Sequence, residues 1–65
     1  MKTVIYKALG VYYATSERNY NAVIRNAREV QELKDFNSAE EIIAYYCKYF
    51  GCKAEDFIIV EEGGN

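Results

Sequence analysis

The sequence predicts an α+β domain in which a small antiparallel-rich sheet of two or three strands is packed by one or two helices. Three observations predict this class: a first segment rich in β-branched and aromatic residues, a capped amphipathic segment after residue 37, and a short apolar run near the C-terminus. The expected chain order is ββααβ or βααβ. With 65 residues, of which 51% are hydrophobic, we expect one compact domain over residues 1–62 and a flexible tail at 63–65.

The first segment, residues 3–15, is predicted to form strands. As one straight strand it would extend about 40 Å, whereas a domain of this length has a diameter of about 28 Å. We therefore expect two strands, residues 2–8 and 11–15, with a turn or bulge at Gly10. The alternative is a single long strand that crosses into a second subunit.

Residues 38–50 carry the clearest helical pattern in the chain. Ser38 can cap the first turn, Glu41 completes a capping box three residues later, and Gly51 supplies a left-handed stop. The apolar side chains that share one side, and are expected in the core, are Ala39, Ile42, Ile43, Tyr46 and Phe50. Tyr45 and Tyr49 extend this arc beyond what a single core contact needs.

The apolar run at residues 57–60 predicts a core strand that is covered on both faces or placed centrally in the sheet. Residues 17–34 allow two interpretations. As a helix capped by Ser16, they align Tyr20, Val23, Ile24, Ala27 and Val30 on one stripe. Three asparagines and the β-branched residues oppose a helix, and a hairpin of residues 22–25 and 29–33 is the alternative. We favour the helix.

The residue inventory predicts no enzyme, no cofactor and no metal site. Histidine is absent, which removes the usual general base and the usual zinc nitrogen ligand. Cys47 and Cys52 are five residues apart, which fits neither a zinc site nor a redox pair, so we interpret both as small buried hydrophobic residues. The paired carboxylates are expected to be solvated charges.

The N-terminus resembles no signal peptide, and no apolar stretch is long enough to span a membrane. Two cysteines are too few for a disulfide scaffold. We therefore expect a cytoplasmic protein that does not act on membranes.

The net charge of −2 hides an asymmetry between the two halves of the chain. Residues 1–28 contain five basic and one acidic side chain, and residues 29–65 contain three basic and nine acidic ones. The simplest interpretation is ordinary surface pairing after folding. The alternative is one basic and one acidic patch that pair with a second copy or with a charged partner. Together with the thin core of so short a chain and the long first segment, this asymmetry leads us to expect a homodimer or a higher homo-oligomer.

Seven tyrosines and no tryptophan favour a surface that tolerates water alone and is buried in a complex. We therefore expect binding to another protein, as an accessory subunit or as a small inhibitor, of the kind phages and mobile elements encode, that occludes a host enzyme. A self-associating structural protein is a third possibility. The predicted interface residues are Tyr45, Tyr49, Tyr12, Tyr13, Arg18, Arg25 and Arg28.

The class alternative is a domain that binds single-stranded nucleic acid. The arginines Arg18, Arg25 and Arg28 could contact phosphates, and tyrosines in the same half of the chain could stack on bases. However, the isoelectric point near 5.0 is far from the basic footprint of such domains, so nucleic acid is not an expected partner.

Overall fold

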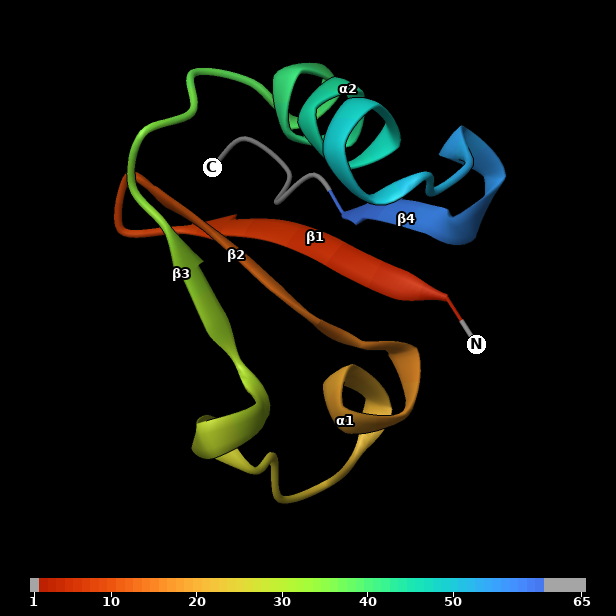
Figure 1. Cartoon of the computed structure of the whole chain (residues 1–65). Coiled ribbons are helices and arrows are strands. Elements are labelled where there is room, and N and C mark those ends of the chain that lie inside the picture. Colours follow the sequence, from red (N-terminus) through yellow and green to blue (C-terminus); the bar gives the residue numbers. More distant parts are fainter. Residues whose placement is uncertain (1, 61–65) are drawn as a thin grey trace.

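The computed structural model describes residues 2–60, which form one four-stranded mixed sheet with a long helix across one face (Figure 1). The strand order is β3-β2-β1-β4, in which β1–β2 and β2–β3 are antiparallel and β4 is parallel to β1. The helices and strands are β1 (Thr3–Ala8), β2 (Val11–Ser16), α1 (Glu17–Asn21), the 3₁₀ turn η1 (Ala27–Glu29), β3 (Gln31–Leu33), α2 (Ala39–Phe50), the 3₁₀ turn η2 (Ala54–Asp56) and β4 (Phe57–Val60).

The α+β class is confirmed, but the prediction gave the sheet too few strands and did not include a parallel pair. The described residues contain four strands instead of two or three, and the fourth is parallel. The chain order is ββαβαβ because a short strand separates the two helices. The tail predicted at residues 63–65 lies outside the described residues.

The β1–β2 hairpin confirms the two strands predicted in the first segment. Its connection is the two-residue turn Leu9–Gly10, and both residues have positive φ angles of 52° and 79°. Two consecutive positive φ angles match the right-handed twist of hairpin strands, and glycine adopts them without strain. The alternative prediction, a single strand that crosses into a second subunit, is therefore wrong.

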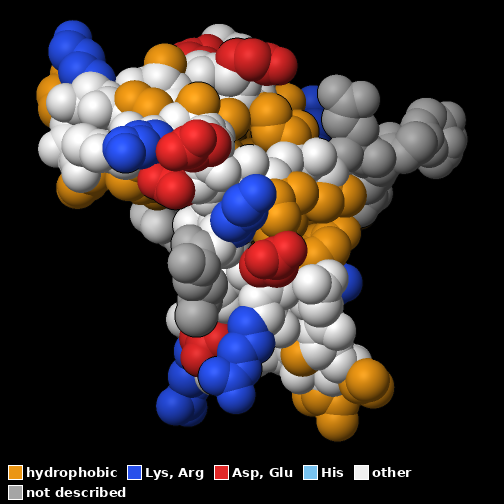
Figure 2. All heavy atoms as spheres, turned by 90° about the vertical axis from the view of Figure 1, so that its right-hand side faces the viewer, with side chains coloured by type: hydrophobic (Ala, Val, Ile, Leu, Met, Phe, Trp, Pro, Cys, Tyr) orange, Lys and Arg blue, Asp and Glu red, His pale blue; other side chains and the backbone are white. Residues whose placement is uncertain are grey.

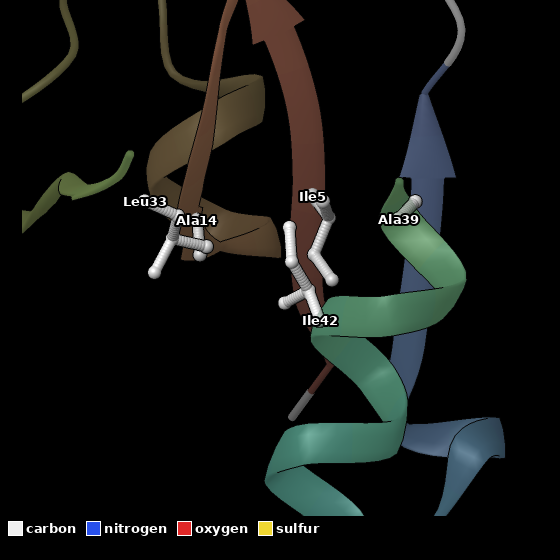
Figure 3. Packing of buried hydrophobic residues seen from close by; sticks show 5 residues of the cluster. All are labelled: Ile5, Ala14, Leu33, Ala39 and Ile42. Atoms are coloured by element: carbon white, nitrogen blue, oxygen red, sulfur yellow. The ribbon is translucent and has the colours of Figure 1, made fainter. Parts of the chain in front are cut away.

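The core lies between the sheet and α2 (Figure 3). Ile5 and Ala14 are cross-strand partners on β1 and β2, and they meet Ile42 from the helix. Ile5 and Ile42 are completely buried, and Leu33 and Ala39 close the two sides of this cluster. The helix therefore sits over the sheet through a small number of aliphatic contacts.

The α2 helix begins and ends where the sequence predicts. The Ser38 hydroxyl accepts from the Glu41 amide at 3.1 Å, and the helix ends at Gly51, which has a left-handed φ of 68°. The prediction that Phe50 is a core residue is wrong, because its side chain is 64% exposed. Phe50 is the last helical residue and extends past the edge of the cluster around Ile42.

Residues 17–34 fold neither as the predicted helix nor as the alternative hairpin. Ser16 caps a helix of only five residues, and the chain then leaves the helix at Ala22 in an extended conformation. The buried residue of this helix is Asn19, and its side chain holds the following loop through hydrogen bonds. Those local bonds replace the hydrogen bonds that a longer helix would have formed.

β4 is an edge strand and none of its residues is fully buried, so both alternatives of the prediction, a strand covered on both faces and a central strand, are wrong. It pairs with β1 alone, from Thr3↔Phe57 to Tyr6↔Val60. Ile59 is left exposed on this edge. The continuous apolar run therefore reflects packing beside β1 rather than burial from all sides.

Candidate functional site

Six aromatic side chains form a continuous cluster on α2 and beside it, which we call the aromatic surface. Its members are Phe36, Tyr45, Tyr46, Tyr49, Phe50 and Phe57. Tyr45 lies at the centre, with ring centroids 4.8 Å from Tyr49 and 5.4 Å from Phe36. Edge-to-face and tilted contacts at such distances stabilise aromatic pairs beyond the area they bury.

One part of the aromatic surface belongs to the core and the other part faces solvent. Phe36, Tyr46 and Phe57 pack against the buried cluster. Tyr45 and Tyr49 are 42% and 61% exposed, and Phe50 joins them at the end of the helix. The exposed rings therefore pack against half-buried rings, and these contacts fix the position of the exposed rings.

The helical repeat explains this arrangement. Ala39, Ile42 and Tyr46 follow one another on the side of α2 that faces the sheet. Tyr45 and Tyr49 are four residues apart, so they lie one above the other on the neighbouring flank. The predicted surplus of aromatic residues on this helix is thus present in the structure as an exposed pair.

Tyr46 also fixes how α2 lies over the edge of the sheet. Its hydroxyl donates a hydrogen bond to Gln31 Oε1 at 3.2 Å, which connects the helix to β3. Burial against the core raises the pKa of Tyr46 above its ordinary value, because the charged phenolate would lose hydration there.

The two other tyrosines predicted at an interface, Tyr12 and Tyr13, are separated by the sheet. Tyr12 lies on the α2 side, packs against the core and has the Lys7 ammonium 5.2 Å from its ring centroid. Tyr13 lies on the opposite face, stacked on Tyr6 at 5.5 Å. Neighbouring residues in a strand point to opposite faces, so these two cannot share one contact surface.

On the face of the sheet away from α2, three tyrosines and one arginine form a row. Tyr6 contacts Tyr13 on one side and Tyr20 of α1 on the other, with ring centroids 5.3 Å apart in the second pair. The Arg25 guanidinium lies 4.3 Å from the Tyr20 ring centroid, in cation–π geometry. We call these four side chains the tyrosine row.

The three predicted arginines lie on three different pieces of backbone. Arg18 is in α1, Arg25 is in the loop after it and Arg28 is in η1, so they do not form the stripe of one helix. All three are exposed, and among residues 2–60 the one ion pair joins Lys34 to Glu32. Figure 2 shows basic side chains at the lower end of the molecule, at the height where α1 lies in Figure 1.

Two features of this lower end were not predicted from the sequence. Val23 and Ile24, which we call the loop tip, are 102% and 88% exposed. Asn19 is buried, donates a hydrogen bond to the Asn26 carbonyl and accepts one from the Asn26 amide. A buried asparagine whose side chain both donates and accepts hydrogen bonds within a loop cannot be recognised from the sequence. The sequence shows only the general preference of asparagine for turns.

The described residues show no group of three or more histidine, cysteine or acidic side chains that could hold a metal ion. Cys47 and Cys52 are free thiols, and both are half buried rather than buried as predicted. No helix within residues 2–60 is long and apolar enough to cross a membrane.

Comparisons of the chain with protein-family models, with curated proteins and with solved structures find no match.

Proposed function

We propose that the protein is a small protein-binding module whose aromatic surface contacts the partner. The observation that carries the proposal is the exposed group of Tyr45, Tyr49 and Phe50, held against half-buried rings. Large rings left in water are costly, whereas each can bury about 150–250 Å² in an interface. Tyrosine and phenylalanine are enriched in the centres of protein interfaces.

The position of these rings favours a protein partner over a small molecule. Small ligands bind in hollows that cover most of their surface. Two hollows in the described structure lie beside the β1–β2 turn and beside α1, and neither of them is lined by a ring of the aromatic surface. An exposed flank of a helix that is capped at both ends is rigid and open, as a docking surface requires.

We also propose that the protein acts as an inhibitor and that it is located in the cytoplasm. An inhibitor that occludes a host enzyme would use such a rigid aromatic patch to cover the rim of an active site. A cytoplasmic location is consistent with the two free thiols. Addition of the purified chain to a candidate enzyme would test the inhibitor form directly, because occlusion lowers the rate of substrate turnover in proportion to bound chain.

The binding proposal is tested with the double variant Tyr45→Ser/Tyr49→Ser and the control Ala44→Ser, which places serine at an exposed position of the same helix. Tagged chains are used to capture partners from nuclease-treated lysate of cells that express the protein. We expect the wild type and the control to retain the same stoichiometric partner, and the double variant to lose it. Equal capture by all three chains would contradict the proposal.

A second candidate function is binding of single-stranded nucleic acid, and the tyrosine row is the observation that favours it. Tyr6 and Tyr13 stand side by side on the two central strands, and Arg25 extends the row with a cation. Aromatic side chains on a sheet face are stacking platforms for bases. Protein binding ranks first because few phosphate-binding cations accompany the row.

A further inference from the structure

The exposed aliphatic side chains of the described residues gather in two places. Val23 and Ile24 form the loop tip after α1. Leu9 and Ile59 are also exposed, and both line the hollow beside the β1–β2 turn. The chain therefore has a projecting aliphatic tip in one place and an aliphatic-lined hollow in another.

The loop tip is held away from the rest of the domain. Asn19 Oδ1 accepts from the Asn26 amide at 2.8 Å, and the Arg25 Nε donates to the Tyr20 carbonyl at 2.8 Å. These bonds fix the chain just after the tip to the helix just before it. The two aliphatic side chains consequently cannot fold back onto the core, and Figure 2 shows a separate hydrophobic protrusion at the lower end of the molecule.

The hollow has the volume to accept two aliphatic side chains, and its lining is part apolar and part polar. Its volume is about 460 Å³, within the range of pockets that bind compact apolar groups. Its apolar lining consists of Ile5, Ala8, Leu9, Tyr12, Ala39, Ile59 and Val60. The two charged residues of the lining are Glu40, in the first turn of α2, and Lys7.

The tip and the hollow of one molecule cannot meet. The hollow lies at the turn of the β1–β2 hairpin, and α1 follows the other end of β2. Six residues of strand separate the two ends by about 20 Å. A tip that enters this hollow therefore comes from another molecule.

The tip and the hollow also carry charged residues of opposite sign nearby. Arg25 directly follows the tip in the chain, Arg18 and Arg28 lie in α1 and η1 on either side of the same loop, and none of the three pairs with a carboxylate among residues 2–60. Glu40 and Glu41 lie in the first turn of α2, at the end of the helix that borders the hollow. When the tip of one copy faces the hollow of the next, the arginines approach these carboxylates.

We infer that the protein self-associates head to tail, with the loop tip of one copy inserted into the hollow of a second copy. The contact joins two different surfaces, so a pair of copies retains a free tip on one copy and a free hollow on the other. Such a contact generates open chains or rings rather than a symmetric dimer. It uses neither Tyr45 nor Tyr49 and is independent of the proposed partner surface.

The experiment combines two variants of the full chain that each lack one half of the contact. Val23→Ser/Ile24→Ser removes the tip and keeps the hollow, and Leu9→Arg/Glu40→Arg blocks the hollow and keeps the tip. All four positions are exposed, so we expect both variants to show the wild-type thermal melt. Mass is measured by analytical ultracentrifugation over a range of concentration and salt.

We expect the wild type to exceed its monomer mass of 7.5 kDa increasingly with concentration, and to dissociate as salt rises. Each variant alone should be a monomer, whereas an equimolar mixture should form a dimer and nothing larger, since only one contact is intact. If Val23→Ser/Ile24→Ser unfolds, the single change Ile24→Arg, which removes one aliphatic side chain of the tip and places a charge there, replaces it in the same mixture.

A monomeric wild type at all concentrations overturns the inference, and so does a mixture that stays monomeric. Self-association that persists in the tip variant but is lost in Tyr45→Ser/Tyr49→Ser also overturns it and assigns the contact to the aromatic surface. Conversely, loss of partner capture in the tyrosine variant with self-association intact supports both proposals separately.

Discussion

The side-chain amide of buried Asn19 donates a 2.7 Å hydrogen bond to the hydroxyl of buried Thr15. That hydroxyl in turn donates to the Glu29 carbonyl at 3.1 Å. Asn19 also bonds the backbone of Asn26, so the end of β2, the helix α1 and the start of η1 are joined by one buried network. The network determines where the loop tip and its arginines lie.

Replacement of Asn19 by alanine should lower the free energy of unfolding by about 1–3 kcal/mol, because buried polar partners are left without hydrogen bonds. The control is Asn21→Ala in the same short helix, where the side chain is exposed and a change within about 0.5 kcal/mol is expected. Urea denaturation followed by circular dichroism measures both. Equal stabilities of the two variants would mean that the network does not hold the loop.

Ile42 and Phe50 are both expected in the core from the sequence, but truncation of their side chains should have different costs in this structure. Ile42→Ala should cost about 2–5 kcal/mol, because the side chain is completely buried and its removal leaves a cavity. Phe50→Ala should cost less than about 2 kcal/mol, because most of the ring is already exposed. The cap variant Ser38→Ala should cost about 1 kcal/mol.

Thermal melts of these three variants check the order. A cost for Phe50→Ala above that for Ile42→Ala would place Phe50 in the core and contradict the structure.

Local signals predicted the parts of the fold that local interactions determine. Ser38 and Gly51 delimit α2 because capping and a left-handed stop need only neighbouring residues. Gly10 marks the hairpin turn for the same reason. Tyr45 and Tyr49 could be placed at one flank of the apolar arc because helical spacing centres that arc nearer to Tyr46.

Contacts between distant segments could not be predicted in this way. β3 has three residues, of which only Leu33 is buried, so it shows no alternation in the sequence. β4 is recognisable as a strand, but its parallel pairing with β1 depends on where the chain returns. Asn19 satisfies partners four and seven residues away, and hydrophobic periodicity does not report such a network.

We predict no binding of single-stranded or duplex oligonucleotides at physiological salt. Even together, Arg18, Arg25 and Arg28 would release too few counterions from a polyanion to hold it against a net charge of −2. Fluorescence anisotropy with labelled oligonucleotides tests this. Micromolar binding that falls steeply with salt and is lost in Tyr6→Ser/Tyr13→Ser would instead place nucleic-acid binding ahead of protein binding.

Stability should decrease at alkaline pH through Tyr46. Its folded-state pKa is raised by burial, so the neutral phenol is favoured in the folded chain. The stabilisation is therefore complete below the pKa of an unfolded tyrosine, about 10, and is lost as pH rises through the higher folded-state pKa. The direction is the reverse of that for a salt-bridged carboxylate.

The variant Tyr46→Phe keeps the ring and removes the ionisable hydroxyl together with its hydrogen bond to Gln31. We expect it to be less stable than the wild type at pH 8, because the bond that connects α2 to β3 is lost, and to lose less stability between pH 8 and 11. Gln31→Leu is the matched control: it removes the same hydrogen bond but retains the phenol, so its stability should still fall over that range. Chemical denaturation at each pH gives the three curves. If the curve for Tyr46→Phe falls as steeply as that of Gln31→Leu, the alkaline loss arises from other groups and Tyr46 does not couple ionisation to folding.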